Sequence, residues 1–312
     1  MEKLVILTGP TAVGKSSLSI KLAKTIGGEI ISADCMQVYK NMNIGTAKIT
    51  PQEMDGVKHY LIDCMEPTEE FHVVKFKELA LKAMEEIYSN GKIPIVCGGT
   101  GFYIQALLYD IQFEEGQKDD ILRASLEDFA DLNGNEALLE KLKEIDPESA
   151  ELIPANNRKR VIRAIEYFQI TGEKISEHNK IERNRKSPYN FAYFVLNDDR
   201  KLLYERIDKR VDKMVSDGLI DEVMSLKNMG CHKGMTSMDG IGYKEILEAI
   251  DENKSIDSAI DLIKQNSRRY AKRQLTWFRR EKDVIWLDRV DLKNDDIILE
   301  KIMFELKEKG II

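Results

Sequence analysis

An apolar run of strand length leads directly into a glycine-rich loop near the start of the chain. Leu4–Thr8 is followed by Gly9-Pro10-Thr11-Ala12-Val13-Gly14-Lys15-Ser16, and apolar residues then recur at helical spacing at Leu18, Leu22 and Ile26. Strand, loop and helix stand in the order of a phosphate-binding P-loop. Glycines let several N–H groups face one concavity, and the helix N-terminus adds partial positive charge there. The stretch predicts a di- or triphosphate site, in which Lys15 is a mobile cation and Ser16 ligates Mg²⁺.

Composition limits the class of protein. The chain has 312 residues, of which 43% are hydrophobic, and this is enough for one large or two ordinary domains. A net charge of −7 argues against general affinity for nucleic acid or membranes. We find no signal peptide and no apolar run near the roughly 20 residues of a membrane span. The four scattered cysteines favour reduced thiols and argue against a zinc site. We therefore expect a cytoplasmic protein with no membrane partner.

A second strand, predicted over residues 29–34, ends in Asp34. Strand-helix-strand order implies a parallel sheet covered by helices, whose strands bind ligands at their carboxyl ends. Asp34 would lie at that edge, and Cys35-Met36-Gln37 would continue into the cleft. Its position alone leaves a helix cap or a turn carboxylate as an equal alternative.

Further strands are predicted over residues 59–63 and 93–97, with helices over 76–89 and 102–108. The first of these strands ends in Asp63, which could resemble a Walker-B carboxylate, although we favour a structural role. The second is followed by Gly98-Gly99-Thr100-Gly101. Paired glycines at a strand end permit close backbone approach to a ligand, to which Thr100 can offer a hydroxyl.

The alternation of strands and helices stops near residue 113. Helices alone are predicted from there to about residue 186, around 121–132, 136–145 and 158–171, until a strand resumes at 191–196. Such a long connection indicates a helical insertion in one α/β core. We predict a core of residues 1–113 and 190–312 and an insertion domain of residues 114–189. The insertion carries a basic cluster of Arg158, Lys159, Arg160 and Arg163.

A strongly basic helix is predicted near the end of the chain, after one or two helices over 200–227. Between residues 264 and 282 there are eight bases against one acid: Lys264, Arg268, Arg269, Lys272, Arg273, Arg279, Arg280 and Lys282. Ala271, Leu275 and Phe278 occupy another face that can be buried. A solvated helix is the simple alternative, but in an acidic chain this excess favours binding to a phosphate backbone, with Tyr270 and Trp277 as stacking rings. A strand at 285–287 and a surface helix complete the chain.

Taken together, these motifs resemble the bacterial tRNA dimethylallyltransferases, also called tRNA isopentenyltransferases. The resemblance rests on the P-loop followed by Ser32-Ala33-Asp34-Cys35-Met36-Gln37-Val38-Tyr39, Gly45-Thr46-Ala47-Lys48, Gly98–Tyr103, Arg160–Ala164, Ile241-Gly242-Tyr243-Lys244-Glu245 and Arg269–Arg280. It implies a P-loop NTPase-like fold with an all-helical insertion. It also implies transfer of a dimethylallyl group from dimethylallyl diphosphate to N6 of the adenosine 3′ of a tRNA anticodon, with release of diphosphate.

The resemblance and the chemistry imply roles for particular residues. An adenine N6 attacks poorly because its lone pair is delocalised, and Asp34 can accept its proton as general base. Lys15, the loop N–H groups, Mg²⁺ on Ser16 and Arg210 would neutralise the leaving diphosphate, with Arg206 as the competitor of Arg210. The implied catalytic set is Asp34, Thr11, Lys15, Ser16 and Arg210, and the implied diphosphate site is Gly9, Pro10, Thr11, Ala12, Val13, Gly14, Lys15 and Ser16.

The implied partners are a tRNA anticodon stem-loop and dimethylallyl diphosphate, with Mg²⁺ as cofactor, and we expect a monomer. The target base must leave its stack to reach the cleft. The implied tRNA-binding residues are Asp34, Cys35, Met36, Gln37, Thr100, Arg123, Arg158, Arg160, Arg163, Arg269, Lys272, Arg273, Trp277 and Arg280.

Some positions depart from the family pattern, and other functions remain open. Relatives usually have His-Pro-Asn near Pro154-Ala155-Asn156, Gln at Asp239 and often Ser at His72. These differences affect local tRNA contacts. The alternatives are a prenyltransferase acting on free adenine nucleotides, a small-molecule kinase using ATP at Lys15, and an RNA-binding module with a relic nucleotide site.

Overall fold

A computed structural model describes residues 1–113 and 119–312, except for the side chain of residue 183. The predicted boundary at 113/114 thus adjoins residues outside the described ranges. Two compact units are present: residues 1–108 with 188–312 form the larger, and residues 109–187 form the smaller. Among the described residues, no helix combines the length and apolar character needed to cross a membrane.

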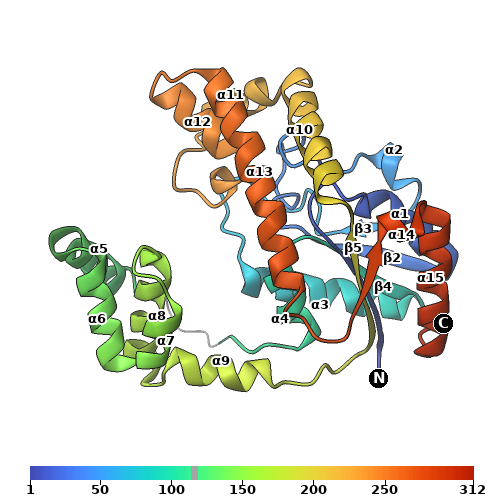
Figure 1. The fold of residues 1–312 in the computed structure, drawn as a ribbon, viewed down its shortest axis with the longest axis horizontal. Coiled ribbons are helices and arrows are strands. Elements are labelled where there is room, and N and C mark those ends of the chain that lie inside the picture. The colour runs from blue at the N-terminus through green and yellow to red at the C-terminus, as the bar shows by residue number, and fades with distance from the viewer. Residues whose placement is uncertain (114–118) are drawn as a thin grey trace. The chain divides into compact units, whose positions relative to one another are not determined.

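The larger unit is built on a parallel sheet, four of whose strands are labelled in Figure 1. Its six strands stand in the order β3-β2-β4-β1-β5-β6. The strands are β1 (Lys3–Thr8), β2 (Gly28–Ala33), β3 (His59–Tyr60), β4 (Ile93–Gly98), β5 (Asn190–Asn197) and β6 (Val284–Asp288). β1 lies centrally, paired with β4 on one side and β5 on the other. The predicted parallel α/β sheet is therefore confirmed, and the carboxyl ends of its strands meet at one edge.

Helices cover both faces of the sheet. α1 (Lys15–Ile26) connects β1 to β2 across β4, and α3 (Val73–Ser89) connects β3 back to β4 across β2. Because right-handed crossovers in opposite directions lie on opposite faces, these two helices cover different sides. Leu18 and Leu22 of α1 pack with Val5 and Leu7 in the main core.

The remaining helices of this unit are α2 (Pro51–Met54), α4 (Gly101–Leu108), α10 (Arg200–Ser216), α11 (Leu219–Asn228), the 3₁₀ turn η1 (Ser237–Asp239), α12 (Tyr243–Asp251), α13 (Ile256–Phe278), α14 (Arg289–Leu292) and α15 (Asp295–Glu308). The predicted surface helix at the end of the chain is α15. It buries Ile298, Ile302 and Leu306 in the main core, so it is a covering layer of the sheet rather than a solvated tail.

Two predicted elements have different bounds. The strand expected over residues 59–63 ends at Tyr60, because Leu61 and Asp63 adopt φ values of 62° and 52° that interrupt an extended chain. The basic helix expected over residues 264–282 begins earlier, at Ile256, and ends at Phe278. Arg279 and Arg280 therefore lie in the turn that follows the helix.

The smaller unit is all-helical in its described part. Its helices are α5 (Asp120–Asn133), α6 (Asn135–Ile145), α7 (Pro147–Leu152), α8 (Arg158–Thr171) and α9 (Ile175–Arg183), of which α7 and α9 were not predicted. Leu138, Leu142 and Val161 are fully buried in a separate core. An independent core explains why this segment interrupts the sheet without contributing a strand to it.

Candidate active site

The P-loop backbone is shaped by three residues with positive φ. Gly9, Ala12 and Gly14 have φ values of 150°, 62° and 90°, and α1 begins immediately afterwards at Lys15. A Cβ at Gly9 would lie 2.5 Å from the carbonyl oxygen of Leu196, so this strand end admits no side chain. The loop is thus curved at the point where the helix N-terminus supplies partial positive charge.

Lys15 folds back over this loop. Its Nζ donates hydrogen bonds to the carbonyl oxygens of Gly9 at 3.0 Å and Pro10 at 2.8 Å. Its pKa is lowered from 10.5 to about 8, chiefly by burial; Arg210 also lowers it, whereas Cys97 and Asp34 oppose the shift. Lys15 is therefore a cation held in a poorly solvated place, which an anion would stabilise.

Asp34 lies half-buried just beyond the end of β2, as predicted from the sequence. Its Oδ1 accepts a hydrogen bond from the backbone N–H of Met36 at 2.9 Å, which fixes the carboxylate in a turn. Charge interactions connect Asp34 with both Lys15 and Arg210. Of the two alternatives, the turn carboxylate is the one present, and it leaves the carboxylate beside two cations.

Beside Asp34, the Thr100 side chain lies near enough to the Cys35 thiol and the Tyr270 hydroxyl to lower the pKa of each group. Burial, with a further contribution from Asp34, raises the pKa of the Cys35 thiol to about 12. Burial also raises the pKa of Tyr270. Cys35 and Tyr270 are therefore neutral near pH 7, and Asp34 is the better proton acceptor of the three.

A cavity of about 430 Å³ opens at this edge of the sheet. Its charged lining residues are Asp34, Arg210, Arg273 and Asp239. The apolar and aromatic lining is formed by Met36, Phe71, Tyr103, Ile207, Val211, Met214, Ile241, Tyr243, Ile263 and Tyr270. Because Thr11 of the P-loop also lines it, the cavity brings a proton acceptor, cations and apolar surface beside the phosphate-binding loop.

The competing arginines of α10 have different surroundings. Arg210 lines the cavity and donates a hydrogen bond to the carbonyl oxygen of Thr46 at 3.3 Å, and burial lowers its pKa. Arg206 instead pairs with the buried carboxylate of Asp198. Asp199, not Asp198, caps α10, through its contacts with two backbone N–H groups. The geometry favours Arg210 as the arginine available to a ligand.

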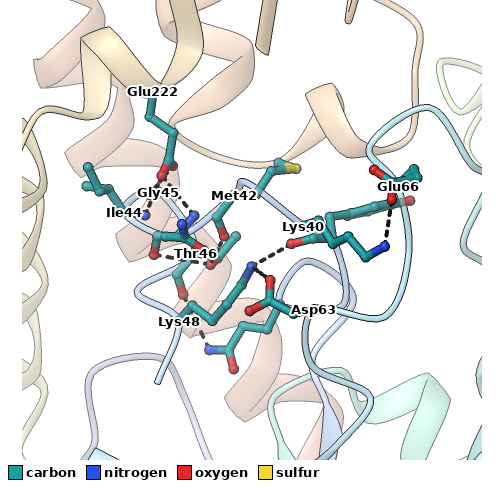
Figure 2. A network of polar contacts seen from close by, with 12 residues as sticks. Lys40, Met42, Ile44, Gly45, Thr46, Lys48, Asp63, Glu66 and Glu222 are labelled. Carbon is teal, nitrogen blue, oxygen red and sulfur yellow. Dashed lines mark hydrogen bonds and ion pairs between the residues drawn. The ribbon is translucent and has the colours of Figure 1, made fainter. Parts of the chain in front are cut away.

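The carbonyl of Thr46 belongs to a loop held by Glu222 (Figure 2). The Glu222 carboxylate, on α11, accepts hydrogen bonds from the backbone N–H groups of Asn43, Ile44 and Gly45 at 2.8–3.0 Å. It also accepts one from the Tyr243 hydroxyl at 2.5 Å. We call residues 43–48 the Glu222-bound loop. Glu222 thus connects α11 and α12 with the carbonyl that Arg210 contacts.

The buried lysine at the end of this loop gives Asp63 its partner. Lys48 Nζ contacts the carboxylate of Asp63 and the carbonyl oxygen of Tyr39, as Figure 2 shows. Asp63 thereby compensates a lysine whose side chain is only 4% exposed. Asp63 does not line the cavity, so its geometry agrees with the structural role favoured from the sequence.

Some cations of the basic helix α13 form ion pairs with a neighbouring helix, and others are exposed. Arg268 pairs with Asp208 and Lys264 with Asp212, both on α10, so these two cations connect helices. Arg269, Lys272 and Arg273 are exposed, as are Arg279 and Arg280 beyond the helix end. The tRNA-binding prediction for Arg269, Lys272, Arg273 and Arg280 stays a prediction.

Trp277 lies against the start of α4. Its ring faces Phe102 edge-on at 6.1 Å, and a Cβ at Gly101 would overlap its indole. A ring held in this way has a packing function of its own, and stacking on RNA remains a prediction. Of the face expected to be buried, Ala271 and Phe278 are fully buried and Leu275 half-buried.

Within the smaller unit, three of the predicted RNA-binding arginines are engaged in ion pairs. Arg123 and Arg163 both contact the fully buried carboxylate of Glu166, at 2.7 Å and 2.8 Å. Burial opposes ionisation of Glu166, but hydrogen bonds from these arginines lower its pKa overall. Arg158 contacts Glu127 and Asp131, whereas Arg160 is exposed. Replacing Arg123 would leave this buried carboxylate with Arg163 but without its second cation, at a cost below the roughly 3–5 kcal/mol of a fully broken buried pair.

Remaining predicted site residues lie at the loop ends. Gln37 donates to the carbonyl oxygen of Thr46 at 3.4 Å, so its amide supports the Glu222-bound loop.

Ser16, the predicted ligand of Mg²⁺, is exposed in the first turn of α1. Across the part of the chain that the structure describes, no cluster of three His, Cys, Asp or Glu residues could hold a metal ion. One hydroxyl nonetheless suits Mg²⁺, which takes few protein ligands and fills its shell with phosphate oxygens and water.

Three residues that contact the loops of this site were not identified as site residues from the sequence: Gln274, Glu222 and Arg289. Gln274 contacts Thr11, and Arg289 Nε donates to the carbonyl oxygen of Val13 at 2.8 Å. Gln274 lies within a motif quoted for the resemblance, which was the available signal. Glu222 and Arg289 follow no pattern in the chain, because their partners are distant in sequence.

The chain is similar to several known proteins. A protein of Lachnoclostridium phytofermentans named tRNA dimethylallyltransferase is 57% identical over 312 residues, which cover all of both chains. The structure resembles that of the full-length tRNA isopentenylpyrophosphate transferase of Bacillus halodurans, with a TM-score of 0.74, 45% identity and coverage of 99% and 98% of the two chains. It also resembles a eukaryotic dimethylallyltransferase acting on tRNA, with a TM-score of 0.83, 29% identity and coverage of 100% and 80%. Residues 37–281 match the family model described as IPP transferase, and the chain belongs to that family.

Proposed function

We propose that this enzyme transfers a dimethylallyl group from dimethylallyl diphosphate to N6 of the adenosine next to the anticodon in tRNA, on its 3′ side. The observation that carries the proposal is the cavity, in which Asp34, Arg210 and the P-loop residue Thr11 share one space with apolar walls. The family and the names of its relatives supply the reaction class. We further propose that the enzyme acts as a monomer in the cytoplasm.

In this proposal the P-loop holds a leaving group instead of driving ATP hydrolysis. Lys15, the loop N–H groups and Arg210 face the diphosphate and stabilise the negative charge that develops as the C–O bond breaks. Ser16 would hold Mg²⁺, which supplies further neutralisation of the phosphate oxygens when bound. The apolar lining, including Phe71 and Ile263, suits the prenyl chain. Excluding water from it protects an allylic carbon that carries partial positive charge.

At the other end of the cavity, Asp34 would accept the proton of the adenine N6. The hydrogen bond from the Met36 N–H orients the carboxylate, so little reorganisation is needed during transfer. The adenine must leave its stack, and the segment 34–37 would read it there. Exposed cations of α13, among them Arg269, would hold the RNA backbone. We further propose that the helical insertion holds the stem-loop from another side.

The test is mass spectrometry of an unmodified anticodon stem-loop incubated with dimethylallyl diphosphate, Mg²⁺ and the protein. We expect the mass of one dimethylallyl substituent to be added, and expect none on a matched stem-loop with guanosine at the target position. Parallel reactions contain AMP with dimethylallyl diphosphate, or the stem-loop with ATP. Prenylation of AMP without prenylation of RNA would contradict the proposal in favour of a free-nucleotide enzyme. Phosphate transfer from ATP would favour a kinase.

A further inference from the structure

Gln274 is a buried amide on the helix that carries the exposed cations. It is 5% exposed, and both ends of its amide are hydrogen-bonded. Its Oε1 accepts from the backbone N–H of Thr11 at 2.9 Å, and its Nε2 donates to the carbonyl oxygen of Gly99 at 2.9 Å. A Cβ at Gly99 would collide with this Nε2, so the glycine makes room for the contact. Gln274 therefore connects the P-loop with the end of β4.

The peptide group between Pro10 and Thr11 is held from both of its ends. Its N–H donates to Gln274, while its carbonyl oxygen accepts from Lys15 Nζ at 2.8 Å. Because N–H and C=O are fixed in one plane, the amide of Gln274 determines where that carbonyl points. It thereby determines where the Lys15 ammonium is held. The Thr11 N–H, in turn, is committed to Gln274 instead of to a ligand.

We propose that Gln274 is a positioning residue for the diphosphate site, acting through the Pro10–Thr11 peptide on Lys15. The inference rests on the proposed function in one respect, that this loop binds a diphosphate. Arg273, the neighbour of Gln274 in sequence, lines the cavity. The helix proposed to face RNA is thus also a structural part of the site that receives the prenyl donor.

The chemistry of the amide separates this role from simple packing. Methionine fills a similar volume but offers Thr11 and Gly99 no comparable hydrogen bond. Glutamate keeps the acceptor for Thr11, but as a carboxylate it faces the carbonyl oxygen of Gly99 without a donor. Protonation of that glutamate restores an O–H donor. A Gln274→Glu variant should therefore depend on pH in a way that a packing defect does not.

The experiment measures binding of inorganic pyrophosphate with Mg²⁺ by calorimetry, in the full chain, at pH 8 and at about pH 5.5. The variants are Gln274→Met and Gln274→Glu. Gln265, an exposed residue of the same helix, gives the matched controls Gln265→Met and Gln265→Glu. At pH 8 we expect both Gln274 variants to bind roughly 10- to 100-fold more weakly than the unsubstituted protein, as the loss of buried hydrogen bonds implies. The Gln265 variants should bind normally.

The pH dependence then decides the question. For Gln274→Glu we expect the ratio of its dissociation constant to that of the unsubstituted protein to fall at the lower pH, while for Gln274→Met the ratio stays constant. Thermal unfolding of each protein at both pH values identifies any unfolded fraction. Binding by Gln274→Met within about twofold of normal, or a Gln274→Glu ratio that does not change with pH, would overturn the inference. If the unsubstituted protein itself fails to bind pyrophosphate, the proposed function fails instead.

Discussion

At the scale of single residues, the candidate site contains Asp34 and Lys15, which follow two strands separated in the sheet by β4. Both are fixed by backbone contacts: Asp34 accepts from the Met36 N–H, and Lys15 donates to two P-loop carbonyls. Their positions could be predicted, because a P-loop and a strand-terminal acid are local patterns. The depressed pKa of Lys15 could not, since it follows from burial in the folded protein and from the approach of Arg210, which is distant in the sequence.

Replacing Asp34 by alanine tests the proton acceptor. We expect turnover of the anticodon stem-loop to fall by roughly 10²–10⁴, the usual contribution of general acid–base catalysis. Binding of the RNA should be largely kept, because Asp34 carries no positive charge for its backbone. The measurements are single-turnover prenylation and RNA affinity by filter binding. Turnover near normal would remove Asp34 from the role of base.

Lys15 predicts a pH dependence for diphosphate binding. An anion stabilises the charged ammonium, so binding above pH 8 must be accompanied by proton uptake. The affinity for pyrophosphate should therefore weaken as pH rises through about 8, by up to about tenfold per pH unit. A Lys15→Arg variant, which stays charged throughout, should show a flatter dependence. Equal slopes for the two proteins would show that another group titrates.

The same shift has a defined sign for folding. The pKa of Lys15 is about 8 in the folded protein against an ordinary 10.5, so the unfolded chain binds more protons between these values. The contribution of Lys15 to stability therefore rises as pH increases through that window. Below pH 8 the buried ammonium opposes folding by a constant amount.

At the scale of elements, α13 shows what sequence periodicity can and cannot distinguish. The eight bases between residues 264 and 282 are equivalent in the sequence. In the fold, Lys264 and Arg268 form ion pairs with Asp212 and Asp208 of α10, while Arg269 and Arg273 remain exposed. The difference depends on which helix packs beside α13, and no pattern within α13 contains that information.

This division predicts different effects for two double variants of α13. Arg269→Ala with Arg273→Ala should weaken RNA binding and reduce the slope of log affinity against log salt by about 0.7–0.9 for each phosphate that is no longer neutralised. Lys264→Ala with Arg268→Ala removes the same charge as a matched control. We expect it to keep the slope, because these cations face α10. Affinity measurements between low and moderate salt would show it, and equal slopes for both variants would contradict the assignment.

The Glu222-bound loop is likewise held by a partner that its own sequence does not reveal. Gly45-Thr46-Ala47-Lys48 is a visible motif in the sequence. The backbone N–H groups at the start of this loop are bound by Glu222, which lies 177–179 residues further along the chain. A sequence indicates that such a loop needs partners for its N–H groups. It does not indicate which acid provides them.

At the scale of the whole molecule, the parallel sheet and the helical insertion could be predicted. Strands and helices alternate along the core sequence, and this alternation stops where helices alone follow one another. The predicted core and insertion, 1–113 with 190–312 and 114–189, differ by a few residues from the two units of the structure. Strand ends and helix ends were less predictable. β3 stops early at a residue with positive φ, and α13 starts earlier than its basic face.

The contacts of the P-loop have a consequence for protein synthesis. The loop leaves the ribosome well before Gln274 and Arg289, which lie 263 and 276 residues after Thr11 and Val13. Until those residues have emerged, Thr11 and Val13 lack these contacts, and closing such long loops is slow relative to local helix formation. A nascent chain that already carries the complete phosphate-binding motif should therefore be unable to retain a diphosphate tightly. Ligand affinity would appear late, together with the last turns of α13 and the start of α14.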